Sequence, residues 1–199
     1  MPRILAISAG LSQPSSTRLL TDRLLTATNQ ELGHAATHNV LELREYAHDI
    51  TDRLLTGFAN DRLRPVLDEV GTADGLILVS PTFTASYSGL FKSFLDVIDP
   101  ETMADKPVLL GATGGTERHS LVLEYALRPV LSYLRAHTVA TAVYAASADW
   151  GNDTELNQRI SRAATELATR VHQSPQQRAT DPFTDPVPFE QLLHDAGTA

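Results

Sequence analysis

The chain has 199 residues, of which 42% are apolar and 20% charged, and its net charge is −8. This length and this proportion of apolar and charged residues predict one globular domain with a full hydrophobic core. Because the chain has no cysteine, disulfides, thiolate nucleophiles, zinc–thiolate sites and iron–sulfur clusters are excluded, and the lack of a lysine and arginine cluster argues against a nucleic-acid partner.

Strand-like and helix-like segments alternate along the chain. We predict strands over residues 3–8, 38–43, 75–80, 107–112 and 138–145, and helices over residues 16–32, 61–70, 88–98, 117–136 and 153–172. We expect residues 44–60 to form a loop with at most a short helix. Leu19, Leu20, Leu24, Leu25 and Ala27 are predicted to form the buried face of the first helix.

Two prolines affect the predicted helices. Pro65 suits the first turn of its helix, whereas Pro129 lies inside the 117–136 segment and should kink it. Five strands that alternate with helices indicate an α/β fold with a parallel sheet covered on both faces.

The predicted domain covers residues 1–173. From residue 174 to residue 199 four prolines interrupt the sequence, so we expect a tail that is either disordered or packed on a neighbouring subunit. No apolar run approaches the roughly 18 residues of a membrane span, and the first residues carry no signal-peptide cleavage pattern. We therefore expect a cytoplasmic protein.

Hydroxyl side chains follow the first predicted strand. Ser8 ends that strand, and Ser12, Ser15, Ser16 and Thr17 lead into the first helix. A helix N-terminus with several hydroxyls can hold a phosphate without a lysine, although Ser15 or Ser16 could simply cap the helix. The segment lacks the dinucleotide fingerprint and the P-loop pattern.

The segment 81–85 connects the third strand to the following helix. Pro81, Thr82, Phe83 and Thr84 offer polar and small groups but no obvious nucleophile, base or metal ligand. This composition favours a loop that holds a flat polar cofactor through its backbone. The alternative is an ordinary strand-to-helix connection capped by Ser88, with Lys92 as a solvated or ion-paired residue of the helix.

Thr113, Gly114 and Gly115 follow the fourth strand. Glycines allow close approach of a ligand or a positive φ, and the alternative is a tight turn with Thr116 as helix cap. His119 could donate a proton but more often such a histidine is a surface residue. The histidines show no metal-ligand spacing, so we expect no metal.

Taken together, these three segments resemble the NADPH-dependent FMN reductase family, and in particular the branch that supplies reduced flavin to two-component monooxygenases such as the alkanesulfonate system. The resemblance spans about residues 3–172. Its most specific part is the run 114–132, GGTERHSLVLEYALRPVLS, together with SGLFKSFLD at 88–96.

The resemblance implies a flavodoxin-like three-layer sandwich, a five-stranded parallel sheet of order 2-1-3-4-5 with helices on both faces. It implies FMN as cofactor and NADPH or NADH as hydride donor. The residues it assigns to cofactor binding are Ser8, Ser15, Ser16 and Thr17 at the phosphate, Pro81, Thr82, Phe83 and Thr84 at the ring, and Thr113, Gly114 and Gly115 at the pyrimidine end. We take Arg118 as a candidate for the 2′-phosphate of NADPH.

In the family an arginine often stands between the last two hydroxyls of the phosphate segment. Here that arginine is absent and Arg18 follows Thr17; whether Arg18 replaces it is open. Tyr125 matches a tyrosine in a π-helical insertion at a subunit interface of the sulfonate branch, and the family implies a homodimer or homotetramer.

The resemblance predicts an NAD(P)H:FMN oxidoreductase in which no protein side chain is catalytic, because the cofactor does the chemistry. A flavin-dependent monooxygenase would then be the partner. Three alternatives remain open at this point: a flavodoxin-type electron carrier, a quinone or azo reductase with bound FMN, and a protein of the flavin fold that binds no flavin.

Overall fold

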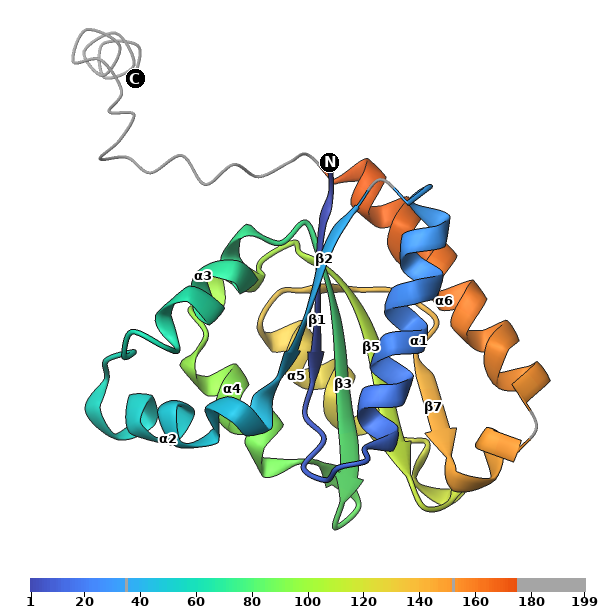
Figure 1. The fold of residues 1–199 in the computed structure, drawn as a ribbon, viewed down its shortest axis with the longest axis horizontal. Helices are drawn as coiled ribbons and strands as arrows, with labels where there is room; N and C mark the ends of the chain where they lie inside the picture. The colour runs from blue at the N-terminus through green and yellow to red at the C-terminus, as the bar shows by residue number, and fades with distance from the viewer. Residues whose placement is uncertain (35, 152, 175–199) are drawn as a thin grey trace, which may run out of the picture.

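The protein is described by a computed structural model in which residues 1–34, 36–151 and 153–174 are placed. The predicted tail, residues 174–199, lies outside this part except for Ser174. A central sheet is covered by helices on both faces (Figure 1). No helix in the described segments is long and apolar enough to span a membrane.

The sheet has seven strands. They are β1 (Arg3–Ser8), β2 (Thr37–Glu42), β3 (Gly75–Phe83), β4 (Ser86–Tyr87), β5 (Pro107–Gly114), β6 (His137–Thr138) and β7 (Val143–Ala146). The order is β2-β1-β3-β5-β6, with β7 also on β5 and β4 paired antiparallel to β3. The core order therefore confirms the predicted flavodoxin-like 2-1-3-4-5 arrangement, with two strands in the fifth position.

In the described part of the chain, six α-helices flank the sheet. They are α1 (Ser16–Glu31), α2 (Ala47–Thr56), α3 (Arg64–Thr72), α4 (Gly89–Val97), α5 (Arg128–Tyr133) and α6 (Asp153–Gln173). Short 3₁₀ segments cover Leu43–Tyr46, Pro100–Met103, Glu117–His119 and Ser147–Gly151, and a π-helical turn covers Leu123–Leu127.

Two apolar cores stabilise the layers. Leu20 and Leu24 of α1 pack with α6 on one face, around Ile77 of β3. On the other face Phe91 and Phe94 of α4 pack with α2, α3 and α5. Figure 1 shows the same division, with α1 and α6 together on one side of the sheet.

The prediction for α1 is wrong at one position. Leu19 is 45% exposed, whereas Leu20, Leu24 and Leu25 are buried. Leu19 is an immediate neighbour of Leu20 and so lies about 100° around the helix from it. The apolar stripe is therefore narrower than the composition suggests.

Residues 44–60, predicted as a loop with room for a short helix, are mostly helical. The segment contains the 3₁₀ turn Leu43–Tyr46 and all of α2, which ends at Gly57 with φ 81°. Leu54, Leu55 and Phe58 are exposed while Ile50 is buried, so the large apolar residues of the segment do not mark one buried face.

The predicted helix 117–136 is interrupted. A 3₁₀ turn, the π-helical turn and α5 replace one continuous helix, and Pro129 lies in the first turn of α5, where its missing N–H is tolerated. Tyr125 lies within the π-helical turn, as the resemblance implied.

The predicted strand 138–145 is split into β6 and β7. Arg128 satisfies the backbone at the interruption, because its guanidinium donates to the carbonyls of Val139 (3.0 Å) and Ala140 (3.1 Å). No local pattern in the sequence predicts this contact of Arg128.

Candidate functional site

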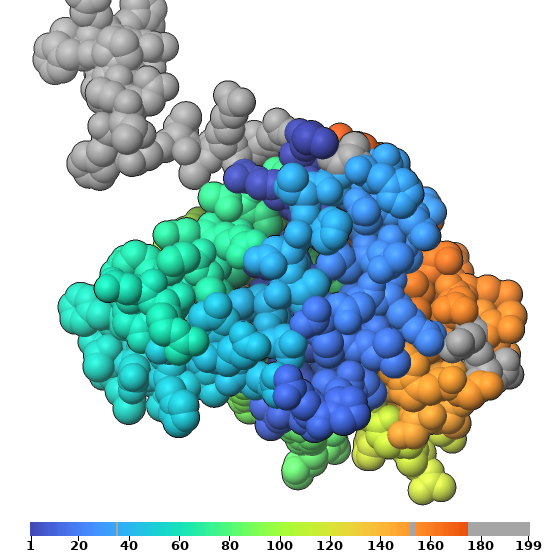
Figure 2. All heavy atoms as spheres, in the orientation of Figure 1, coloured from blue at the N-terminus to red at the C-terminus, as the bar shows by residue number. Residues whose placement is uncertain are grey.

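The carboxyl ends of β1, β3, β5 and β7 lie at one edge of the sheet, at the bottom of Figure 1. In the space-filling view the segment after β1 (dark blue), the tip of β3 (green) and the segment after β5 (yellow-green) gather at this edge (Figure 2). Ligands of open α/β sheets bind at such an edge, where the strand order reverses.

The segment after β1 turns tightly into α1. Ser15 caps the helix, and its Oγ accepts a hydrogen bond from Arg18 N (3.2 Å). A Cβ at Gly10 would overlap Ser15 Oγ, so the turn can close this tightly only with glycine there. Ser16 is exposed at the start of the helix, beside backbone N–H groups that lack helical partners.

Thr17 and Thr113 join two of the predicted segments. Their Oγ1 atoms are 2.8 Å apart, and both side chains are buried, with 2% and 3% of their surface exposed. The hydroxyl of Thr17 therefore faces the protein and not the open edge, as does that of Thr113. Ser8 is likewise buried at the end of β1.

The predicted loop 81–85 is instead a β-hairpin. β3 continues to Phe83, Thr82 pairs with Tyr87, and Thr84 and Ala85 form the tip with φ of 47° and 63°. Two positive φ angles are typical of a type I′ turn, which usually carries Asn-Gly. The sequence lacked that signal, so the hairpin was missed.

Ser80 holds the base of the hairpin. Its buried Oγ donates to the carbonyl of Pro81 (2.9 Å) and accepts from Ser88 N (3.0 Å). Ser88 in turn caps α4 by accepting from Phe91 N, which confirms the predicted cap. Ser80 was not among the predicted site residues, because a serine that ends a buried strand has no distinctive neighbours in the sequence.

Tyr144 of β7 supports the Gly114 turn. Its hydroxyl donates to the carbonyl of Thr116 (2.8 Å), and a Cβ at Gly114 would overlap that hydroxyl. Gly114 is therefore required by a side chain beneath it, whereas Gly115 has open space around it. Neither glycine has the positive φ that the sequence analysis allowed for.

Thr82 lies between the hairpin and this turn. Its Oγ1 is buried close to the Tyr144 phenol but makes no hydrogen bond of good geometry to any residue of the described segments. Burial raises the pKa of Tyr144, and the nearby Thr82 hydroxyl acts in the opposite direction. The phenol therefore stays protonated near neutral pH and remains a hydrogen-bond donor.

The charged candidates lie at the rim. Arg118 and His119 are exposed on the 3₁₀ turn after β5. Lys92 forms an ion pair with Asp96 of the same helix (2.6 Å), which confirms the alternative that it is an ion-paired helix residue. Arg18 is directed away from Ser15 and pairs with Asp22 and Glu42.

Comparisons with known proteins identify the family. The model of the family described as NADPH-dependent FMN reductase matches residues 2–151. The chain is 41% identical over 170 residues to an FMN reductase (NADPH) of Pseudomonas aeruginosa, covering 83% of this chain and 90% of the relative. It is 37% identical over 168 residues to the NADH-dependent FMN reductase SfnE of Pseudomonas putida, covering 84% of this chain and 86% of the relative.

Among solved structures, an oxidoreductase from Corynebacterium diphtheriae superimposes with a TM-score of 0.85 at 40% identity. The match covers 88% of this chain and 99% of that chain. Both the sequence and the strand order thus agree with one assignment. The chain belongs to the NADPH-dependent FMN reductase family.

Proposed function

We propose that this protein transfers a hydride from NADPH or NADH to FMN at the carboxyl edge of its sheet. The observation that carries the proposal is the junction of the α1 N-terminus, the β3–β4 hairpin and the Gly114 turn in a chain of this family. When bound, FMN accepts the electron pair in the form of a hydride from the nicotinamide.

The phosphate end of the flavin fits the start of α1. Ser15 and Ser16 offer hydroxyls, Thr17 offers its backbone N–H, and the helix dipole favours an anion there. Thr17 would contribute through its backbone because its hydroxyl is engaged with Thr113. Ser8 would act from below, as a buried support for the turn.

The ring end fits the hairpin and the Gly114 turn. The buried Thr82 Oγ1 lacks a good partner within the described chain, which suits a polar atom of a heterocycle. Phe83 is 45% exposed and could cover an apolar part of the ring, while Pro81, Thr84, Thr113, Gly114 and Gly115 border the same space.

In this mechanism the protein orients the flavin ring and shields it. The Ser80 and Tyr144 hydrogen bonds fix the hairpin and the turn, so the ring would be held between rigid backbone segments. Arg118, exposed at the rim, would contact the 2′-phosphate of NADPH. If Arg118 does not make this contact, we expect NADH to be the donor. No protein group needs to exchange a proton during hydride transfer.

We also propose a homodimer or homotetramer. Leu121 just before the π-helical turn, Tyr125 within it and Tyr133 at the end of α5 are 60%, 79% and 84% exposed. Such an apolar surface is typical of a subunit interface. Sedimentation of the purified protein tests this, and a clean monomer would contradict it.

A flavin-dependent monooxygenase is the proposed consumer of the reduced flavin, because the sequence resembles the branch of the family that supplies two-component monooxygenases. We place this exchange in the cytoplasm, where reduced nicotinamides are available. The tail, residues 174–199, is proposed as an appendage of the 1–173 domain and lies almost wholly outside the described residues.

The test is steady-state oxidation of NADPH and NADH by one preparation, with and without added FMN, together with its flavin content. We expect oxidation of at least one donor that depends on FMN. Oxidation of neither donor would overturn the proposal, and permanently bound FMN without donor oxidation would instead indicate an electron carrier.

A further inference from the structure

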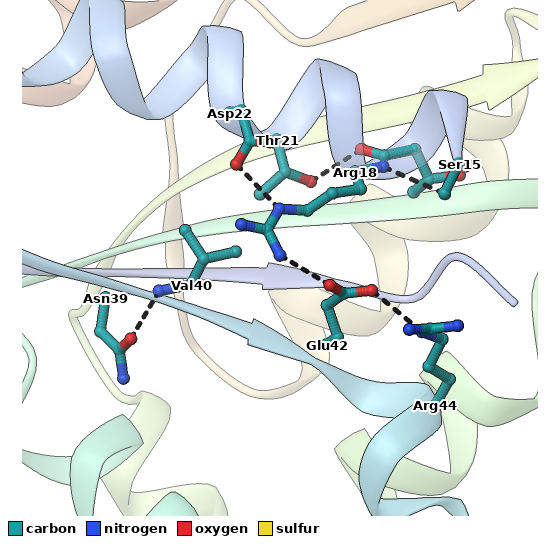
Figure 3. Close-up of polar contacts among 9 residues, drawn as sticks. Ser15, Arg18, Thr21, Asp22, Asn39, Val40, Glu42 and Arg44 are labelled. Atoms are coloured by element: carbon teal, nitrogen blue, oxygen red, sulfur yellow. Dashed lines mark hydrogen bonds and ion pairs between the residues drawn. The ribbon is translucent and has the colours of Figure 1, made fainter. Parts of the chain in front are cut away.

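Arg18 occupies the third position of α1, close to the proposed phosphate site. Its Nε donates to Asp22 Oδ1 (2.8 Å) and its Nη1 to Glu42 Oε1 (2.7 Å). Figure 3 shows the side chain extending from the helix start toward these two carboxylates and away from Ser15.

Glu42, at the end of β2, binds a second guanidinium. Its Oε2 accepts from Arg44 Nε (3.0 Å), and Arg44 also contacts the side-chain amide of Gln13 in the segment after β1. Two arginines and two carboxylates thus form one cluster without net charge beside the phosphate segment. Only 17% of the Glu42 side chain is exposed.

The partial burial of Glu42 makes it the controlling member of this cluster. A largely buried carboxylate depends on its guanidinium partners far more than an exposed one does. The Arg18–Asp22 pair is by contrast an exposed pair one helical turn apart, which contributes little. Release of Arg18 would therefore leave Glu42 with one charged partner in place of two.

Without this cluster Arg18 could reach the helix start. Side chains of a helix incline toward its N-terminus, and arginine has the length and the fork geometry to bind a phosphate with two hydrogen bonds. The structure directs this guanidinium to Glu42, so the site presents only hydroxyls, N–H groups and the helix dipole to a phosphate.

We propose that Glu42 is a specificity-determining residue that withholds Arg18 from the flavin phosphate. The site then distinguishes FMN from riboflavin only through hydroxyls, N–H groups and the helix dipole, and therefore less strongly than it would with a free guanidinium. This inference rests on the proposed flavin site and answers how the chain functions without the arginine that its family often places between the last two hydroxyls.

The test measures the Kd of FMN and of riboflavin by quenching of flavin fluorescence, at low and high salt. For the natural protein we expect the two Kd values to differ by less than about tenfold, with weak salt dependence, because neutral donors dominate. Glu42→Gln should tighten FMN binding roughly five- to tenfold, increase its salt dependence and leave riboflavin unchanged.

Three further variants assign the effect. Glu69→Gln is the matched control, because it removes the same charge from a carboxylate whose partner is the neutral amide of Asn39; it should change neither Kd. E42Q/R18Q should lose the gain in FMN affinity, whereas E42Q/R44Q should keep it. Arg18→Gln alone should leave the FMN Kd within about twofold, and thermal unfolding checks that each variant folds.

The inference is overturned if Arg18→Gln alone weakens FMN binding tenfold or more without affecting riboflavin, because Arg18 would then be a phosphate ligand. It is also overturned if Glu42→Gln fails to tighten FMN binding, or if the gain is lost with Arg44 and not with Arg18. If Glu42→Gln does not fold, the Arg18→Gln result decides alone. Failure of the natural protein to bind either flavin would overturn the proposed function itself.

Discussion

The Thr17–Thr113 hydrogen bond offers a double-mutant cycle at the centre of the site. The two hydroxyls are 2.8 Å apart, nearly inaccessible to water, and connect the first turn of α1 to the end of β5. Thr17→Val or Thr113→Val alone would leave the other hydroxyl buried without this partner, at a cost of about 1–3 kcal/mol in unfolding free energy. T17V/T113V removes both hydroxyls, and we expect it to cost only about 0–1 kcal/mol.

Urea unfolding followed by circular dichroism measures the four free energies. The double variant should therefore be more stable than the sum of the two single effects predicts, by at least about 1 kcal/mol. Each single variant should also weaken FMN binding, because the start of α1 is displaced from the Gly114 turn. Additive effects would refute the pairing, and a single variant as stable as the natural protein would refute the burial argument.

Gly114→Ala should destabilise the protein by about 1–3 kcal/mol because its Cβ overlaps the Tyr144 hydroxyl; G114A/Y144F should recover part of this loss in the same unfolding assay, and no recovery would contradict the overlap. Burial lowers the pKa of Lys106 to about 8 from 10.5. The folded protein thus loses this proton before the unfolded chain does, so this group adds stability as pH rises from about 8 to 10.5. Urea unfolding at both ends of that range should show a gain relative to Lys106→Met of roughly 1–3 kcal/mol, and parallel profiles would contradict it. T84N/A85G places the residues preferred by a type I′ turn at φ of 47° and 63°, and should raise stability by about 1 kcal/mol in thermal unfolding; a lower melting temperature would show that the native pair is not strained.

The sequence predicted the parallel core of the sheet because buried strands appear in it as continuous apolar runs. Runs such as residues 75–80 and 107–112 are almost wholly apolar, and both lie inside strands of the structure. Helix α2 has no such run, because two of its large apolar residues, Leu54 and Leu55, face outward. Arg128 satisfies the backbone at the interruption between β6 and β7 from eleven and twelve residues earlier, and no local pattern reveals this contact.

The sequence identified which segments meet at the proposed site, but not which of their atoms make the contacts. The three segments chosen from their hydroxyls and glycines do meet at one edge of the sheet. Their contacts, however, depend on Ser80 and Tyr144, which lie inside buried strands and were indistinguishable there from ordinary core residues. The role of Tyr144 becomes visible only when β5 and β7 are paired, and that of Ser80 only when the β3–β4 hairpin is formed.

The hydroxyls after β1 show why composition cannot assign roles within a segment. Ser15, Ser16 and Thr17 are chemically similar, yet one caps the helix, one is exposed and one is bound to Thr113. The direction of each side chain follows from the helical turn that begins at Ser15, and a helix changes direction by about 100° per residue. The same rotation turns Arg18 toward Asp22 and Glu42. The Arg18 charge, which the sequence placed beside the proposed phosphate segment, is therefore neutralised by carboxylates of the second turn and of β2, and we expect the affinity of the proposed site to depend on residues that never contact the flavin.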